Sequence, residues 1–524
     1  MAVEVSSPVS ALAASLPWPL RVLLPLLVAL VGYCAYSYFL HPLARYPGPL
    51  SARLGLPIWR FHHCWTRDYA FALHAEHKRH GPVVRIGPNH LSFSDPEAIA
   101  CIYSASGGLS SKFVKTAFYR AFQVFKDSPS IFSERNPEVH AKRKRAIAPA
   151  YSIGALGQLE EYVELVADQL VDRIATDATP KGGPIKLDRY FSCLAMDVIG
   201  EIAFGESFGL LHGDINDAQR SHFFAGVLNL SQWGAIAGCL PWISHLILKA
   251  MPRITGEPGG WVIGAATKSR IDKRYEDERT GLSSARPDML SKFMAAKHPD
   301  SRKQYSQREV LFTATSVIAA GADTTSTTLS IFFGYLAAHP ECYAKLQAEV
   351  DAAWQDGTLT SPIKYKEAVE LPYLQACLKE VLRLHPPISM DLPRCVPPGG
   401  AMIAGRFIPE GTTVGMSPYV VHHNPDAFGQ DCDAFRPERW IDATDDEKKR
   451  MDRYNLTFGG GSRTCIGKNI SLMEVSKIVP ELVTRFSFKV PGYKALEKGK
   501  VPFERKSAWF LEAHDLVLEV TPRS

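Results

Sequence analysis

The stretch Phe458-Gly459-Gly460-Gly461-Ser462-Arg463-Thr464-Cys465-Ile466-Gly467 decides the fold class of this chain. It runs into a helical pattern of apolar residues formed by Ile470, Met473, Ile478, Leu482 and Phe486. Backbone N–H groups of a glycine-rich loop and the positive end of the following helix both stabilise a thiolate. The stretch therefore predicts that Cys465 is ionised and binds a metal.

Other residues of this loop suit a flat cofactor that carries carboxylates. Gly461 and Gly467 let the backbone approach such a cofactor closely. Arg463, two residues before the cysteine, can pair with a carboxylate, and Phe458 can cover the sulfur and keep it dry. The alternative is a buried structural cysteine after a glycine-rich turn, which would be the better interpretation of a lone cysteine.

Five positions of the loop together match a known pattern. They resemble the haem-binding signature FxxGxRxCxG of the cytochrome P450 family at Phe458, Gly461, Arg463, Cys465 and Gly467. A chance match in a chain of this composition is on the order of one in ten thousand. The resemblance extends over nearly everything after the N-terminal segment. It implies a mainly α fold with a minor β part, a haem b cofactor, and Cys465 as the axial thiolate ligand of its iron.

A second motif lies within a long apolar pattern from Glu309 to His339, which predicts a helix buried in the core. Ala320-Gly321-Ala322-Asp323-Thr324-Thr325 resembles the oxygen-activating motif of the family. A mid-helix threonine can bond back to a carbonyl and open a local bulge. An acid beside an alcohol makes a proton relay, so Asp323 and Thr324 are the predicted catalytic residues. A helix N-cap, or a polar pair facing a neighbouring helix, is the alternative.

A third motif predicts a structural charge cluster. Glu380 and Arg383 stand at i,i+3 on one helix face, although roughly one or two such ExxR matches are expected by chance. The downstream segment Phe435-Arg436-Pro437-Glu438-Arg439-Trp440 resembles the PERF segment of the family. The resemblance implies that Glu380, Arg383 and Arg439 form a buried triad. A carboxylate clamped by two guanidiniums suits a fold lock better than a catalyst.

The resemblance also indicates partners for the haem carboxylates. Arg394 matches a family position that often pairs with a propionate. Many members carry W-x-x-x-R in an early helix, where this chain has His140 and Lys144. Both can donate to a carboxylate, but lysine does so as a point charge, and Arg143 or Arg145 are alternatives to it. The basic run Lys142 to Arg145 is thus interpreted as haem contact plus docking of an acidic electron donor, in preference to a nucleic-acid patch.

The composition favours one large domain. The chain has 524 residues, of which 46% are hydrophobic, and no linker, low-complexity block or repeat divides it. A formal net charge of +5 is too small to argue for nucleic acid. The ten cysteines include no CxxC pair, which argues against a zinc site or a redox dithiol and favours a reducing compartment.

The N-terminal segment predicts a membrane anchor. Residues Val22 to Leu40 are apolar and uncharged, and about 19 helical residues can cross a hydrocarbon core. A cleaved signal peptide is the alternative, but the run is long and ends in bulky aromatics. Basic residues are in excess after the run, which predicts a cytoplasmic catalytic domain on the endoplasmic reticulum membrane. The expected organisation is a lumenal segment 1–21, a single-pass anchor 22–40, a proline-rich hinge 41–50 and a catalytic domain 51–524.

Strand patterns are few. Val83 to Gly87 and Leu91 to Ser94 predict one hairpin. Ala401 to Ile408 and Thr412 to Met416, joined through a Pro-Glu-Gly turn, predict another. Leu516 to Val520 predicts a C-terminal strand.

These observations predict a monooxygenase that inserts one atom of O₂ into a lipophilic small molecule. The chain has no flavin, nucleotide or iron–sulfur motif, so electrons must come from a partner. Family analogy indicates an NADPH-dependent cytochrome P450 reductase, helped in some systems by cytochrome b5. Phe118 to Phe122 and His140 to Ser152 are similar to fungal members such as benzoate para-hydroxylases and pisatin-demethylase-type enzymes. This favours a terpenoid, polyketide or similar secondary metabolite as substrate.

Three alternatives stay open. Hydroxylation of an aromatic acid is the second candidate within the same class. A haem-thiolate isomerase or dehydratase would need no reductase, and the intact Asp323-Thr324 pair argues against it. A membrane-anchored haem-binding protein without catalysis would bind haem but turn over no substrate.

Overall fold

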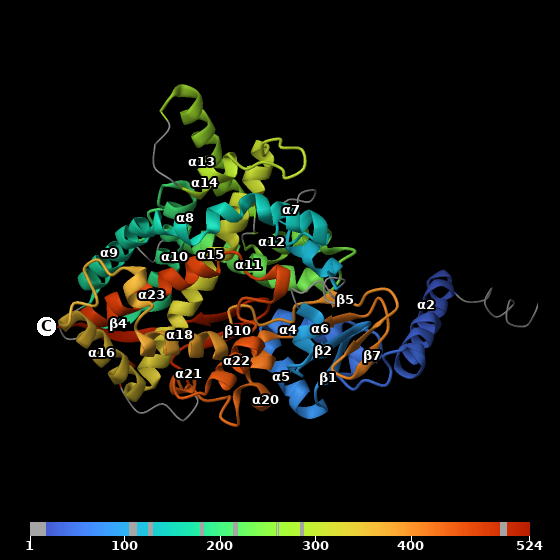
Figure 1. The fold of residues 1–524 in the computed structure, drawn as a ribbon. Coiled ribbons are helices and arrows are strands. Elements are labelled where there is room, and N and C mark those ends of the chain that lie inside the picture. Colours follow the sequence, from blue (N-terminus) through green and yellow to red (C-terminus); the bar gives the residue numbers. More distant parts are fainter. Residues whose placement is uncertain are drawn as a thin grey trace, which may run out of the picture.

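Helices form most of the molecule, with small sheets distributed among them (Figure 1). The computed structural model describes residues 17–103, 113–123, 129–178, 183–212, 218–257, 259, 261–282, 288–492 and 500–523. The predicted mainly α class with a minor β part is confirmed. The longer helices are α2 (Trp18–Ala35), α5 (Tyr69–His80), α7 (Pro137–Ile147), α9 (Glu160–Asp177), α10 (Leu187–Phe204), α11 (Ala218–Gly238), α12 (Ser244–Thr255), α13 (Trp261–Thr280), α15 (Gln307–Ala338), α16 (Pro340–Gln355), α18 (Pro372–Leu384), α22 (Asp445–Tyr454) and α23 (Lys468–Arg485).

Shorter helices connect these elements. They are α3 (Leu50–Arg53), α4 (Ile58–Thr66), α6 (Ala98–Tyr103), α8 (Ile153–Gly157), α14 (Met289–Met294), α17 (Tyr365–Ala368), α19 (Pro418–His422), α20 (Pro425–Phe428) and α21 (Glu438–Ile441). Within the described residues, four further turns are wound differently, the π-helical η1 (Tyr36–Leu40) and the 3₁₀ turns η3 (Ala117–Phe122), η4 (Ala148–Tyr151) and η5 (Gly461–Arg463).

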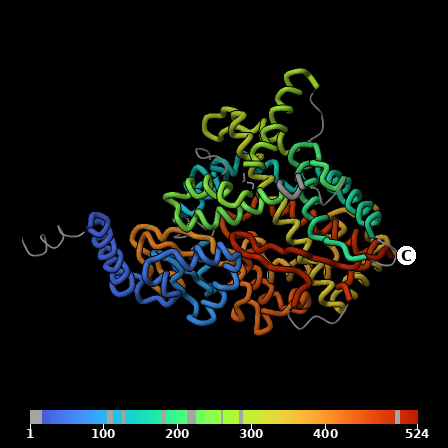
Figure 2. Tube along the Cα trace, turned by 180° about the vertical axis from the view of Figure 1, so that it is seen from behind, coloured from blue at the N-terminus to red at the C-terminus, as the bar shows by residue number. Residues whose placement is uncertain are grey.

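The largest sheet joins segments that are far apart in the sequence. Its order is β1-β2-β8-β5-β3, with β1 (Val83–Gly87), β2 (His90–Phe93), β8 (Thr413–Gly415), β5 (Arg394–Cys395) and β3 (Val114–Lys115). Figure 2 shows the N-terminal strands (blue) beside the segment that contains β8 (orange). The other sheets pair β4 (Gly183–Lys186), β12 (Val517–Pro522) and β9 (Phe486–Lys489), then β10 (Glu504–Ser507) with β11 (Leu511–His514), and β6 (Ala401–Ile403) with β7 (Arg406–Ile408).

One predicted hairpin was wrong. The segment expected as a single strand over Ala401–Ile408 folds back on itself, so that β6 pairs with β7. The turn between them is possible because Ala404 and Gly405 both have positive φ, at 44° and 73°. Thr413–Gly415 instead joins the large sheet, parallel to β2 and antiparallel to β5. The first predicted hairpin, β1 with β2, and the C-terminal strand β12 are present.

Helix α15 is the central helix of the core. Its start is fixed by a capping box in which Ser306 and Glu309 bond each other's backbone N–H groups. It packs against α10, and side chains on most of its circumference are buried. It is continuous α-helix from Gln307 to Ala338, so the bulge expected at Ala320–Thr325 is absent. A helix this long can present residues to cavities on two of its faces.

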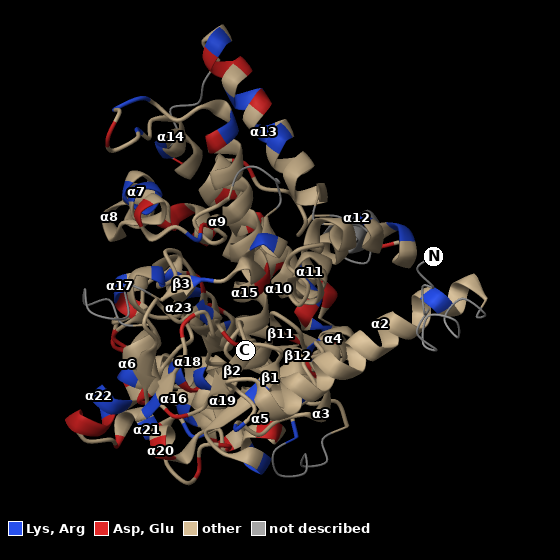
Figure 3. Ribbon diagram, turned by 90° about the vertical axis from the view of Figure 1, so that its right-hand side faces the viewer, with Lys and Arg blue, Asp and Glu red and all other residues tan. Residues whose placement is uncertain are grey.

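The N-terminal helix stands away from the body (Figure 1). Helix α2 and η1 together span Trp18–Leu40, with a mean hydropathy of 1.9, and are long and apolar enough to cross a membrane. Arg21 is the charged residue of this span, which is otherwise tan in Figure 3. Most of the expected lumenal segment, residues 1–16, lies outside the described residues.

The end of this span is held against the body. Ser37 is 1% exposed and donates to Arg53 O at 2.9 Å, while Arg85 donates to the backbone and side-chain oxygens of Ser37, both at 2.9 Å. A Cβ at Gly48 would lie 2.1 Å from Arg85 O, so glycine is needed where the proline-rich hinge crosses β1. The end of this apolar span is thus held against the sheet that contains β1.

Candidate active site

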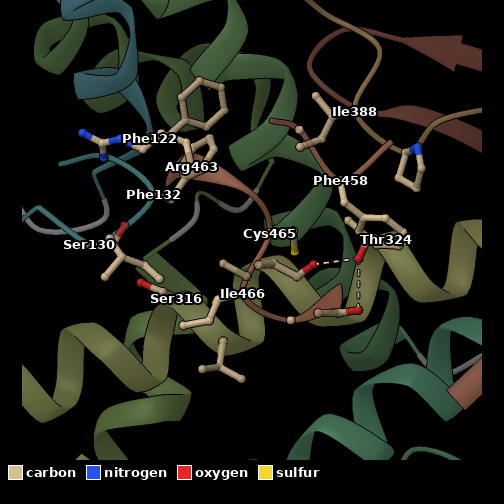
Figure 4. A pocket seen from close by; sticks show the side chains of 18 of the residues that line it. Phe122, Ser130, Phe132, Ser316, Thr324, Ile388, Phe458, Arg463, Cys465 and Ile466 are labelled. Atoms are coloured by element: carbon tan, nitrogen blue, oxygen red, sulfur yellow. Dashed lines mark hydrogen bonds between the residues drawn. The ribbon is translucent and has the colours of Figure 1, made fainter. Parts of the chain in front are cut away.

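A cavity of about 330 Å³, within the range of small-molecule sites, opens beside Cys465. Its walls come from the loop around Cys465, from α15 and α11, and from the segment around β5 (Figure 4). Apolar side chains from several segments line it, and they include Phe122, Leu230, Ile388, Leu392, Trp509 and Phe510.

Cys465 lies between η5 and the start of α23, with its sulfur on the cavity wall (Figure 4). Its own N–H donates to Phe458 O at 2.9 Å, which closes the loop. The thiol is enclosed by protein yet accessible from the cavity, and burial raises the pKa of Cys465. The backbone N–H groups of Gly467 and Lys468, and the charge of Lys144, act in the opposite direction on that pKa.

The backbone conformation of Gly461 and two hydrogen bonds from Lys144 hold the loop in place. Gly461 has φ of 63°, in the left-handed region where glycine is favoured. Lys144 Nζ, on α7, donates to Ser462 O at 3.0 Å and to Thr464 O at 3.1 Å. Lys144 also lines the cavity, whereas Arg143 bonds Pro129 O and Glu134, outside the cavity lining.

Four cations line this cavity, and they are Lys115, Lys144, Arg394 and Arg463. Glu474 is the residue of the described lining that carries a carboxyl group. Burial raises the pKa of Glu474 to about 8, so this carboxyl is neutral at pH 7. Arg394 bonds Tyr119 Oη at 3.0 Å, and Arg463 bonds Glu134 O at 2.7 Å. These hydrogen-bond partners are neutral, so no ionised carboxylate within the described lining pairs with the four cations.

This excess of positive charge lowers the pKa values of the neighbouring basic groups. Burial and the charges of Arg394 and Arg463 hold the pKa of Lys115 well below its usual value. Burial and Arg394 lower the pKa of Arg463 to about 10. Burial and the surrounding cations lower the pKa of His140 to about 3, so this ring is neutral at pH 7. An anionic ligand with two carboxylates beside Cys465 would relieve the repulsion, and haem is such a ligand.

Lys115 and Tyr119 were missed in the sequence. Lys115 is the direct strand partner of Arg394 in the β3–β5 ladder, and Tyr119 follows on η3. Both are buried, at 5% and 1% exposure. A lone lysine in a segment without a motif carries no signal of its own, and only the strand pairing brings it to Arg394.

The residues of the α15 motif lie on two faces of the helix. Thr324 lines the cavity, and its hydroxyl donates to Ala320 O at 2.9 Å (Figure 4). Gly321 lines it too, and a Cβ there would lie 2.8 Å from Ile199 Cδ1 of α10. Asp323 does not line this cavity but a second one, of about 70 Å³. The predicted acid and alcohol are therefore adjacent in the chain but face different spaces.

The structure brings the three residues of the predicted triad together. Glu380 is fully buried and accepts from Arg383 at 2.7 and 2.9 Å and from Arg439 at 3.3 Å. Although burial would raise it, these guanidiniums hold the pKa of Glu380 below its usual value. The triad is joined to the cysteine loop through His422, which bonds Arg383 O at 2.9 Å and accepts from Leu456 N–H at 2.8 Å.

Comparison with known proteins agrees with this geometry. The family profile of cytochrome P450 matches residues 54–502. The cytochrome P450 monooxygenase cicH of Emericella nidulans is 35% identical over 90% of this chain and 92% of its own length. The cytochrome P450 monooxygenase gsfF of Penicillium aethiopicum is 33% identical over 88% and 92%, and pisatin demethylase of Fusarium vanettenii is 30% identical over 96% and 94%.

Proposed function

The chain belongs to the cytochrome P450 family and is a P450 monooxygenase, and we propose that the Cys465 thiolate ligates the iron of haem b in the 330 Å³ cavity. The observation that carries this proposal is the wall of cations beside Cys465 that has no counter-ion of its own. The cavity supplies what the cofactor requires, namely a thiol facing inward and donors for two carboxylates.

Haem supplies a site at which O₂ takes up electrons and protons, so that one oxygen atom enters the substrate and the other leaves as water. The chain's own residues hold and serve this cofactor. Arg463, Arg394 and Lys115 bind the propionates as charged donors, and Tyr119 adds a hydroxyl. Lys144 orients the cysteine loop through two carbonyls, and neutral His140 donates to a propionate. Phe458 packs beside the sulfur and excludes water.

Proton delivery falls to the predicted pair on α15. Thr324 presents a hydroxyl to the cavity and holds it by its bond to Ala320 O. Asp323, the next residue, supplies the proton that Thr324 passes on. The carboxyl of Asp323 is suited to this role, because burial and then the charge of Glu512 raise its pKa to about 8.

The substrate is a neutral lipophilic molecule. The part of the lining supplied by Phe122, Phe132, Phe312, Ile388 and Trp509 is apolar, with hydroxyls of Thr313 and Ser316 beside it. The cations of the described lining act on one another's pKa values, or on that of Cys465, and are assigned to the haem carboxylates and the loop. An aromatic acid would need a further cation, which favours a terpenoid or polyketide, and the fungal relatives support a role in secondary metabolism.

The anchor and the electron donor follow from the same architecture. Helix α2 places the enzyme in the endoplasmic reticulum membrane as a single-pass protein with a cytoplasmic catalytic domain. An NADPH-dependent cytochrome P450 reductase supplies the electrons, assisted by cytochrome b5. Exposed Trp242 and Leu246, before and within α12, add a second contact with the membrane.

The test is the reduced carbon-monoxide difference spectrum of the membrane-bound holoenzyme. Cys465→Ala should abolish the thiolate-type Soret band, whereas Cys101→Ala, a half-buried cysteine of α6, should keep it. An unchanged spectrum in Cys465→Ala would overturn the ligand assignment. A panel of terpenoids, polyketides and benzoates is then screened for substrate-induced spectral shifts.

The same preparation separates the alternatives. The compound with the largest shift is incubated with reductase, NADPH and ¹⁸O₂. Incorporation of one labelled oxygen supports the monooxygenase. Conversion without NADPH indicates an isomerase or dehydratase, and haem without any turnover indicates a binding protein.

A further inference from the structure

The second cavity lies against the face of α15 that carries Asp323. Its walls come from α10, α11, α15 and β11, and its titratable residues are Asp188, Asp323, Glu512 and His514. Val227 lines both this cavity and the main one, so its side chain borders both spaces. No group of three or more ligands in the described residues could hold a metal ion, so these carboxyls do not form a cation site.

Three carboxyl oxygens in this cavity have no hydrogen-bond partner within the described part of the chain. They are Asp323 Oδ2, Glu512 Oε1 and Asp188 Oδ1. Glu512 is 2% exposed, yet one of its oxygens is unpaired where it lines the cavity. Buried polar atoms are rarely left without a partner, and a polar space of about 70 Å³ has room for water.

The other oxygen of Glu512 leads to the surface. Glu512 Oε2 accepts from His514 Nε2 at 2.8 Å and from Arg67. The side chain of His514 is 23% exposed and that of Arg67 is 21% exposed. A titratable ring in contact with solvent therefore touches a buried carboxylate, which in turn lines the same cavity as Asp323.

We propose that His514 and Glu512 take protons from solvent and pass them through this cavity to Asp323, which supplies Thr324. The proposal rests on the proposed monooxygenase function. Each turnover consumes two protons together with two electrons from NADPH, and they leave in the water formed from the second oxygen atom. Glu512 is reprotonated from His514, and His514 from bulk water. Because Asp323 and Thr324 are neighbours on α15, rotation of the Asp323 side chain past Val227 carries the proton from one cavity to the other.

Glu512→Gln is the decisive variant, because the amide still accepts from Arg67 and His514 but cannot carry a proton. Product formed per NADPH should fall roughly tenfold, with peroxide rising in its place. This loss is smaller than the roughly 100-fold rate contribution at the low end of general acid–base catalysis, because water still reaches the cavity. The solvent deuterium isotope effect on product formation should increase. Glu512→Asp, which keeps a carboxyl, should restore most of the coupling.

Structural and competing explanations are separated by matched variants of the same holoenzyme. Glu349→Gln removes a half-buried carboxylate that accepts from Tyr373 N–H and Leu374 N–H, remote from both cavities, and should leave the isotope effect unchanged. Glu474→Gln removes a different buried carboxyl, which lines the main cavity and is bonded to Thr325. An isotope effect that rises in Glu474→Gln but not in Glu512→Gln would overturn the relay.

Thr324→Ala distinguishes the relay from the function on which it rests. If Thr324→Ala releases peroxide while Glu512→Gln stays fully coupled, the relay is wrong and the monooxygenase stands. If the wild-type holoenzyme lacks the thiolate spectrum, both are wrong. Raised peroxide in Thr324→Ala and Glu512→Gln alike, with recovery in Glu512→Asp, supports the relay.

Discussion

Two clusters of buried charge in this protein differ in how their cations are neutralised. In the first, Glu380 pairs with Arg383 and Arg439, and Asp431 also pairs with Arg439, so two carboxylates match two guanidiniums. In the second, the cations at the main cavity have neutral partners only, and each lowers the pKa of its neighbours. A compensated cluster stabilises the chain by itself, whereas an uncompensated one requires an anionic ligand.

The buried carboxyls of the two regions show the same difference. Arg383 and Arg439 hold the pKa of Glu380 down despite complete burial. Glu474 is 3% exposed, and burial raises its pKa to about 8 because its partner is the neutral hydroxyl of Thr325. Burial alone therefore does not decide whether a carboxyl is ionised, since its partners do.

The largest effect should come from breaking the matched cluster. Glu380→Gln leaves Arg383 buried without an anion, while Arg439 keeps Asp431 at 2.6 Å, and the free energy of unfolding should fall by about 3–5 kcal/mol. That is a large part of the about 5–15 kcal/mol available to a folded domain, so the yield of folded protein should drop sharply. Urea unfolding of the purified protein measures it. Glu276→Gln, whose exposed partner Arg279 lies at 2.6 Å, is the control and should unfold as the wild type does.

A pH-dependent effect on stability should follow from Glu474, whose buried carboxyl has a neutral partner. A carboxyl whose pKa rises from about 4.3 in the unfolded chain to about 8 in the fold opposes folding increasingly as pH rises between these values. Glu474→Gln removes this penalty, so its stability relative to the wild type should grow from pH 5 to pH 8. The growth is at most about 1.4 kcal/mol per pH unit. Urea unfolding at both pH values measures it, and a constant difference would contradict the assignment.

Replacing a cation of the unmatched cluster should have opposite effects with and without haem. Lys115→Met removes a buried charge, so the apoprotein should unfold at no lower urea concentration. The holoprotein should lose haem about tenfold faster, or about 1.4 kcal/mol, because one propionate donor is gone. Transfer of haem to an apo-haem acceptor protein measures the rate. Lys142→Met, whose partner is Asp300 at 2.5 Å, should release haem at the wild-type rate.

The smallest effect concerns Arg85, a buried cation that belongs to neither cluster. Arg85 is fully buried and bonds neutral oxygens of Ser37 and Pro88 at 2.7–2.9 Å. Ser37→Ala removes one of these acceptors and should lower the free energy of unfolding by about 1 kcal/mol. Thermal unfolding in detergent measures it. Cys34→Ala in the same N-terminal helix should have no effect, and equal shifts in both variants would mean that the anchor is not seated through Ser37.

Much of the fold class and the centre of the site could be predicted from local patterns. A glycine-rich loop ahead of a helix positions Cys465 through its own backbone, within a few residues. The long apolar pattern predicted α15 almost to its ends. Spacing at i,i+3 places Glu380 and Arg383 on one face of α18, because helix geometry is local.

Features that depend on pairing between distant segments could not be predicted in this way. The segment after Ala401 folded back at Ala404–Gly405, and the following strand joined β2, some 320 positions earlier in the chain. Lys115 reached the lining of the main cavity only through its pairing with Arg394. The alternation of polar and apolar residues along a strand does not identify its partner, because any strand of matching polarity can pair with it.

The sequence by itself determined the candidate groups of the site: Cys465, the α15 pair and the Glu380 triad all lie within short motifs whose geometry is set by neighbouring backbone. Tertiary structure alone decided which space each group faces. Asp323 and Thr324 are adjacent, but about 100° separates successive side chains on a helix, so they open into different cavities. The contact of Glu512 with that second cavity arises because β11 packs against α15, which no local pattern encodes.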